Sequence, residues 1–211
     1  MPGRPFHKPT RFEPHRFEAY LGGEDPARTR AVAHESARAL VDHGHRSGAE
    51  VTVDRLLEFA DAHGIDTLAE LWAQTAADSL PGALWRLHLL RAFIREGGGE
   101  VAAGAFRRGV ARLRTADQAI AGVPEGAGPS EVLALADTIL RGAYRGDLGD
   151  ALDRAAACCR ILAAGTLDDA DASDVGDAAR ASRLTTRAAR LATIGAELHV
   201  CARRERAGTL D

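Results

Sequence analysis

A short line of basic side chains crosses an otherwise apolar segment of this sequence. It consists of His88, Arg91 and Arg95, at i, i+3 and i+7 spacing within the segment 79–96, SLPGALWRLHLLRAFIRE. On a helix, this spacing places the three side chains on one face. If a groove lies open above them, they form a candidate ligand site. The alternative, which we favour, is ion pairing with carboxylates of neighbouring helices, because an unpaired buried guanidinium is costly in free energy.

A second group of candidate contacts lies in an N-terminal arm, residues 1–24. Prolines keep the start of this arm from forming a regular helix, and aromatic residues alternate with basic ones along it. Bases of a nucleic acid can stack on such aromatic rings while the cations contact phosphates. Alternatively, the rings pin the arm onto the helical body. The candidate nucleic-acid or partner contacts of the arm are Arg4, Lys8, Arg11 and Arg16.

A third group is a row of arginines in the last expected helix. The row consists of Arg180, Arg183, Arg187 and Arg190, at i, i+3, i+7 and i+10 spacing. Aligned on one helix face, these side chains could grip a phosphate backbone or an acidic partner. The alternative is that they stay in water while their stems cover apolar neighbours.

Signatures of catalysis and of metal binding are missing from the sequence. It contains no Glu-x-x-His pair of the kind found in di-iron bundles and no Gly-x-Ser-x-Gly turn. Lys8 is the only lysine, so the body of the protein lacks the lysine of a phosphate-binding loop or of a Schiff base. The acidic run 168–177 departs from the calcium-loop pattern and is better explained as an acidic cap on the last helix. We expect no catalytic residue, no metal site and no cofactor.

Cysteine usage and hydropathy indicate a cytoplasmic protein. Cys158, Cys159 and Cys201 form no disulfide framework, and the two adjacent cysteines would point about 100° apart on a helix. They are typical of reduced core residues. The N-terminus lacks the apolar region of a signal peptide, and no apolar run reaches the roughly 18 residues of a membrane span.

The elements that must position these residues are helices. Alanine, leucine and arginine dominate the 211 residues, and aromatic residues make up only 5%. We expect an all-α fold, a single bundle-like domain of about eight helices around a central apolar helix at 80–96, which others must wrap on all sides. The other expected helices cover 25–43, 52–63, 67–77, 100–114, 130–144, 148–164 and a final stretch to about 206.

Caps and linkers complete this plan. Ser79 with Pro81, Thr67 with Glu70, and Ser130 are the expected N-terminal signals of their helices. The segment 121–130, AGVPEGAGPS, is the one convincing internal linker. It divides the helical domain, 25–211, into candidate lobes at 25–114 and 131–206.

Three segments resemble a family of all-helical actinobacterial proteins that has no characterised activity. They are SLPGALWRLHLLR at 79–91, FRRGV at 106–110 and GDLGDALDRAAACCR at 146–160. The resemblance covers most of residues 25–206 and implies a bacterial cytosolic origin, but no activity. Gly146 and Asp147 followed by Ala151 also resemble half of a tetratricopeptide unit, of which about three copies are needed for a stable stack.

The function expected from these features is macromolecular interaction. The first hypothesis is a non-enzymatic protein that binds an unknown protein partner through its arm or an arginine face. The second is nucleic-acid association, in particular DNA binding, through the same residues, although a net charge of -3 argues against a general polyanion binder. An enzyme of unknown class is the third.

Overall fold

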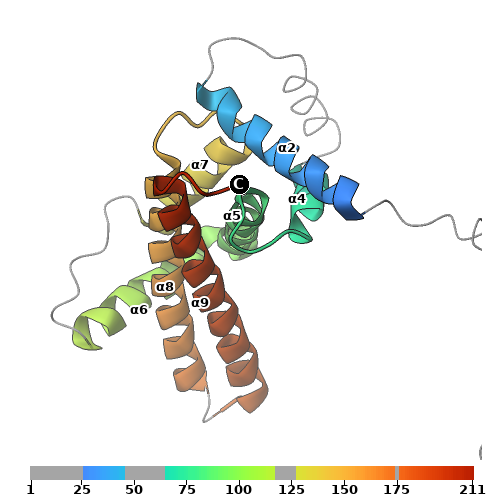
Figure 1. Cartoon of the computed structure of the whole chain (residues 1–211). Coiled ribbons are helices and arrows are strands. Elements are labelled where there is room, and N and C mark those ends of the chain that lie inside the picture. The colour runs from blue at the N-terminus through green and yellow to red at the C-terminus, as the bar shows by residue number, and fades with distance from the viewer. Residues whose placement is uncertain (1–25, 46–64, 117–126, 174–175) are drawn as a thin grey trace, which may run out of the picture.

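The protein is built from helices. The computed structural model describes residues 26–45, 65–116, 127–173 and 176–211. Within these ranges it contains seven α-helices, one short 3₁₀ helix and no strand, which confirms the predicted fold class (Figure 1). The elements are α2 (Pro26–His45), α4 (Ile65–Ala73), α5 (Leu80–Arg95), η1 (Glu96–Gly99), α6 (Glu100–Ala116), α7 (Pro129–Leu140), α8 (Leu148–Ser173) and α9 (Ala178–Arg206). The helix predicted at 52–63 lies outside the described residues.

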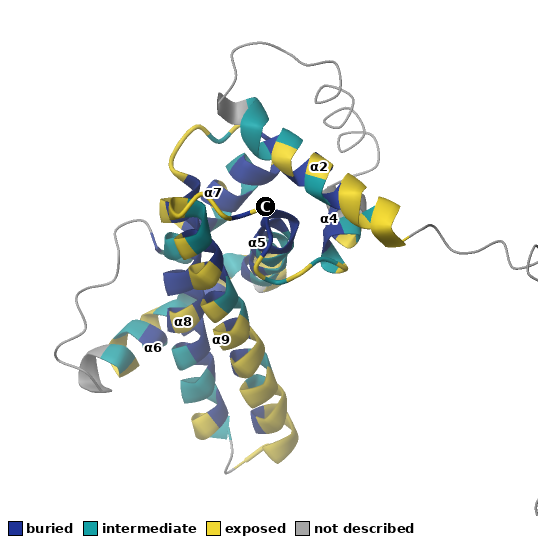
Figure 2. Ribbon diagram, in the orientation of Figure 1, coloured by how far each residue is buried: buried dark blue, intermediate teal, exposed yellow. Residues whose placement is uncertain are grey.

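Helix α5 is the centre of the hydrophobic core. Ser79 caps its N-terminus, because the Ser79 hydroxyl accepts the backbone N–H of Gly82 at 3.2 Å, and Pro81 follows in the first turn, as predicted. Leu84, Leu87 and Leu90 are fully buried. Each leucine withdrawn from water in this way contributes about 1.5–3 kcal/mol. All six other described α-helices contact α5, and many of its residues are buried, shown dark blue in Figure 2.

The prediction that α5 is wrapped on all sides is wrong on one side. Leu89 and Phe93 are only half-buried. Helix α9 contacts α5 but crosses it and continues beyond it, so that it covers only part of this side (Figure 1). An apolar strip of α5 therefore stays accessible beside α9.

Helices α8 and α9 form a long antiparallel pair, against which α6 packs (Figure 1). Two glycines set the contact between α6 and α8. A Cβ atom added at Gly109 would overlap the carbonyl oxygen of Ile161, and one added at Gly165 would overlap that of Ala105. The two backbones therefore meet without intervening side chains.

Helices α2 and α4 contact α5 directly, and the C-terminal residues contact both Arg38 of α2 and the start of α5. The indole N–H of Trp72 donates to the Ser36 hydroxyl at 3.1 Å, which ties α4 to α2 in the buried core. The backbone N–H of Leu80 donates to the backbone oxygen of Asp211 at 2.5 Å, and Leu210 is buried. The first turn of α5 is thus held by the end of the chain.

Several predicted helix boundaries are wrong. Helix α2 continues through Gly44 to His45. Helix α4 begins at Ile65 and ends at Ala73, so Thr67 lies inside the helix instead of capping it. Helix α7 is capped by Gly128 with Pro129 in its first turn, whereas Ser130 lies inside the helix and its hydroxyl donates to the Glu131 carboxylate. It ends at Leu140, four residues before the predicted end.

The acidic run was also assigned to the wrong helix. Helix α8 extends nine residues beyond its predicted end at Ala164, so Asp168, Asp169 and Asp171 belong to α8 and not to the start of α9. Asp177 alone among the described acidic residues caps α9, by accepting the backbone N–H of Arg180 at 2.9 Å.

We predict that Gly165→Ala lowers the free energy of unfolding by about 1–3 kcal/mol, despite the higher helix propensity of alanine, because the methyl group overpacks the α6–α8 contact. Urea unfolding measures this. The matched control is Gly104→Ala in α6, where the nearest atom to the added Cβ is a flexible Arg108 nitrogen at 3.4 Å. The control should be as stable as the unmodified protein or slightly more so, and equal losses in both variants would contradict the close approach.

Candidate functional site

The basic line on α5 is divided between two environments. Arg91 donates to Asp137 of α7 through Nε at 2.5 Å, and Arg95 donates to the same carboxylate through Nη2 at 2.9 and 3.1 Å. The Arg91 and Asp137 side chains are each only 16% exposed. His88 instead stacks on Trp85, with ring centroids 5.5 Å apart and 17° between the planes. The expected ion pairing is confirmed for the two arginines, while a ligand role for the three residues stays a prediction.

The pair of arginines holds the Asp137 carboxylate in its charged form. Burial by itself raises the pKa of Asp137, but the hydrogen bonds and positive charges of Arg91 and Arg95 outweigh it, and the pKa lies below its ordinary value. This charged cluster fixes α7 against α5 and leaves its arginines satisfied.

The candidate contacts of the arm, Arg4, Lys8, Arg11 and Arg16, lie outside the described residues. The row on α9 lies inside them. Arg180 is exposed in the first turn of α9, and the other three members border a groove between α5 and α9 of about 650 Å³. We call it the α5–α9 groove; it is lined by Leu89, Phe93, Ser182, Arg183, Thr186, Arg187, Arg190, Leu191 and Ile194.

Two helices contribute complementary parts of this groove. Leu89 and Phe93, one turn apart on α5, supply apolar side chains, and Leu191 and Ile194 supply more from α9. The arginines and the two hydroxyl residues come from α9 alone. The result is an apolar floor with a cationic edge on one side.

Arg187 occupies the middle of that edge. Its guanidinium carbon lies 4.3 Å from the centroid of the Phe93 ring, in a cation–π contact, and its Nη2 donates to the Glu96 carboxylate at 2.5 Å. The Glu96 side chain is 67% exposed. Arg187 therefore covers the aromatic ring while a solvent-exposed carboxylate neutralises it.

The two arginines on either side of Arg187 differ from it. Arg183 and Arg190 are exposed, and neither makes an ion pair or a side-chain hydrogen bond with any described residue. Two cations without counter-ions among the described residues therefore border the groove, one helical turn to either side of Arg187.

A second pocket, of about 520 Å³, is lined by residues of α8 and α9 and contains an ion-pair cluster. The Asp153 carboxylate contacts His199 Nδ1 at 2.8 Å and accepts from Arg206 at 2.7 Å, and Arg206 also donates to Asp150 at 2.9 Å. Burial by itself raises the pKa of Asp153, but the hydrogen bonds to His199 and Arg206 lower it by more, so the pKa lies below its ordinary value. These contacts join α8 to α9 and leave both carboxylates paired.

The acidic residues at the end of α8 pair with α6. Arg108 donates to Asp169, and Arg112 donates to Asp171 at 2.8 Å and lies 3.7 Å from Asp168. The prediction that this acidic run caps the last helix was wrong. The arginines that pair with it lie about sixty residues earlier in the chain, on a helix whose position the sequence does not reveal.

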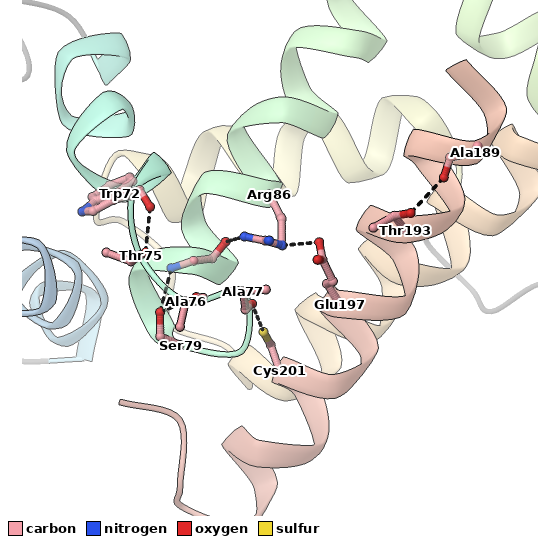
Figure 3. Close-up of polar contacts among 11 residues, drawn as sticks. Trp72, Thr75, Ala76, Ala77, Ser79, Arg86, Ala189, Thr193, Glu197 and Cys201 are labelled. Carbon is pink, nitrogen blue, oxygen red and sulfur yellow. Dashed lines mark hydrogen bonds and ion pairs between the residues drawn. The ribbon is translucent and has the colours of Figure 1, made fainter. Parts of the chain in front are cut away.

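A further ion pair and the cysteines lie near the crossing of α5 and α9. Figure 3 shows Arg86 of α5 meeting Glu197 of α9, at 2.5 Å, and Cys201 reaching the carbonyl of Ala77 at 3.3 Å. All three cysteines are free and buried, as predicted. Burial raises the pKa of Cys158 to about 12, with a smaller contribution from Glu131, and burial likewise raises the pKa of Cys201 to about 11. Thiols held protonated in this way are poor nucleophiles.

Within the described parts of the chain, no cluster of three or more His, Cys, Asp or Glu residues could hold a metal ion. None of the helices described is both long and apolar enough to cross a membrane. Comparisons of the chain with protein-family models, with curated proteins and with solved structures find no match.

The sequence located the cations of the groove but not its floor. Leu89 and Phe93 were assigned to the covered surface of α5, and Glu96 was treated only as the end of that helix. Two patterns in the sequence could have indicated it. One is the pair of apolar residues Leu191 and Ile194 beside the arginines of the last helix, and the other is the pair Leu89 and Phe93, one turn apart on the central helix. Only the crossing of the two helices brings them together.

We predict that Asp137→Asn lowers the free energy of unfolding by about 1–3 kcal/mol, because it leaves two guanidinium groups without their shared charge. Arg95→Ala is the matched comparison: the Arg95 side chain is 45% exposed, so its loss should cost less than about 1 kcal/mol. Chemical unfolding at neutral pH measures both. A cost for Arg95→Ala equal to that of Asp137→Asn would contradict the assignment of Arg91 as the main partner.

The lowered pKa of Asp137 also predicts how its contribution varies with pH. Its contribution to stability is fully present above the unfolded pKa of about 3.9 and is lost as the pH falls through the lower folded value. The stability difference between the unmodified protein and Asp137→Asn should therefore be constant from about pH 7 to 5 and shrink below about pH 4. Unfolding curves across this range measure it, and a difference that grows on acidification would refute the charged cluster.

Proposed function

We propose that this protein is a non-enzymatic interaction module that binds another protein through the α5–α9 groove. The observation that carries the proposal is the combination of an accessible apolar floor with two exposed arginines, Arg183 and Arg190, that lack counter-ions among the described residues. Covering the apolar side chains is favourable, and carboxylates of a partner would complement the two cations and select for that partner.

The apolar floor favours a protein over a nucleic acid as the partner. A nucleic-acid strand gains affinity by stacking bases on aromatic rings, but the one aromatic ring among the groove's lining residues, that of Phe93, is covered by the Arg187 guanidinium. Leu89 and Ile194 offer contacts that suit apolar side chains. A groove with a hydrophobic centre and a charged edge is typical of protein interfaces.

Other features are consistent with a binding role. The described thiols are buried and held protonated. Several arginines elsewhere, Arg91 of α5, Arg108 of α6 and Arg206 of α9, are neutralised by carboxylates of neighbouring helices. We place this activity in the bacterial cytoplasm, in keeping with the resemblance stated above and with cysteines of the reduced kind.

We predict that proteins captured from a lysate of the source organism depend on the groove and not on nucleic acid. The variant is the pair Arg183→Glu and Arg190→Glu; the control is Arg160→Glu and Arg203→Glu, which makes the same charge change at two exposed arginines outside the groove. Proteins retained by the unmodified chain should persist after nuclease treatment, persist on the control and disappear from the groove variant.

Two results would contradict the proposal. Equal retention by the groove variant and the control would remove the groove from binding. Loss of all retained proteins after nuclease treatment would transfer the function to nucleic-acid association, for which the α9 row and the arm would be the contacts.

A further inference from the structure

We infer that the occupant of the α5–α9 groove is an acidic amphipathic helix of the partner protein. This inference rests on the proposed function, because it specifies the kind of partner that the same groove accepts. Three features lead to it: the apolar lining of the groove, the spacing of the arginines and the contact that Glu96 already makes.

The lining of the groove suits a helix. Apolar side chains come from two crossing helices, Leu89 and Phe93 of α5 and Leu191 and Ile194 of α9, and of these Leu89 and Ile194 are half-buried and open to a partner. A third helix packs against such a surface with apolar residues at i, i+3 or i+4, and i+7. An extended strand would have no sheet edge to pair with in the described part of the protein.

The spacing of the arginines specifies the charge of that helix. Arg183, Arg187 and Arg190 stand at i, i+4 and i+7 on α9, which spans about 10 Å at 1.5 Å per residue. A helix lying along α9 rises by the same amount per residue, so carboxylates at i, i+4 and i+7 on its flank meet the three guanidinium groups in register. Arginine is well suited to these pairs because its planar group binds carboxylates through two nitrogens.

Glu96 shows how a carboxylate sits at this edge. It contacts Arg187 at 2.5 Å while Arg187 stays over Phe93. A carboxylate of the incoming helix would make the same contact after displacing Glu96, which is largely exposed and free to turn into water. Glu96 is thus an internal competitor, and its removal should strengthen binding of an acidic helix.

The test uses the full chain and synthetic helical peptides of about sixteen residues, with binding followed by fluorescence anisotropy. The acidic peptide carries leucines at i, i+3 and i+7 and glutamates along one flank. Its basic counterpart has lysine in place of every glutamate, and a third peptide has the composition of the acidic one with its leucines dispersed around the helix. A single-stranded DNA oligonucleotide is the fourth probe.

We predict that the acidic peptide binds and that the basic and dispersed peptides bind about tenfold more weakly or not at all. Arg183→Glu with Arg190→Glu should weaken the acidic peptide by about tenfold or more, whereas Arg160→Glu with Arg203→Glu should leave its affinity within about twofold. Glu96→Gln should tighten binding about two- to fivefold, the effect of freeing one exposed ion-pair partner. Circular dichroism of each variant establishes that it is folded.

The outcomes separate this inference from the proposed function. Equal affinity for the acidic and basic peptides, or weaker binding of the acidic peptide to Glu96→Gln, overturns the acidic helix. The acidic helix is also overturned if no peptide binds while capture of lysate proteins still depends on Arg183 and Arg190. In each of these cases the groove keeps its role as a protein-binding site. DNA binding that is lost in the groove variant, without any peptide binding, overturns both.

Discussion

The structure depends on the burial of α5, a helix too apolar to face water on most of its circumference. Leu84, Leu87 and Leu90 have no exposed surface, and every other described α-helix contacts this one. Covering such a helix requires partners from several directions, and these come from sequence as distant as α2 and α9. The cover is incomplete where α9 crosses α5, and there Leu89 and Phe93 line the α5–α9 groove. The proposed binding site thus includes a part of the central helix that the fold leaves uncovered.

Arginine–carboxylate pairs fix the helices around this core. Arg91 and Asp137 join α5 to α7, Arg86 and Glu197 join α5 to α9, and other arginines of α6 and α9 pair with carboxylates of α8. A guanidinium that bridges two helices sets their orientation more narrowly than apolar contact does, because it is planar and directional. Arg183 and Arg190 are instead exposed and make no ion pair with a described residue. Both arginines line the same groove as the uncovered apolar strip, so one partner surface could contact the cations and the strip together.

Local signals predicted local structure well, and they failed where distant residues decide. Ser79 and Pro81 correctly mark the start of α5, since a cap and its helix are neighbours in sequence. The end of α8 was misplaced because Gly165 and the aspartates after it resemble a break followed by a new N-terminus. In the fold that glycine is where α6 touches α8, and the aspartates meet arginines of α6. The arginines of the groove were found from their spacing alone, but its floor was not, because the crossing of α5 and α9 is a tertiary feature.

In the proposed function, the uncovered strip of α5 and the unpaired arginines of α9 act as one binding surface. The most direct measurement is the change in amide chemical shifts of the isotope-labelled protein when the acidic amphipathic peptide is added. We expect the largest changes to fall together on residues 89–96 of α5 and η1 and 182–194 of α9, while the ion-pair cluster around Asp153 is unaffected. Changes confined to one of the two helices, or centred on the Asp153 cluster, would contradict it.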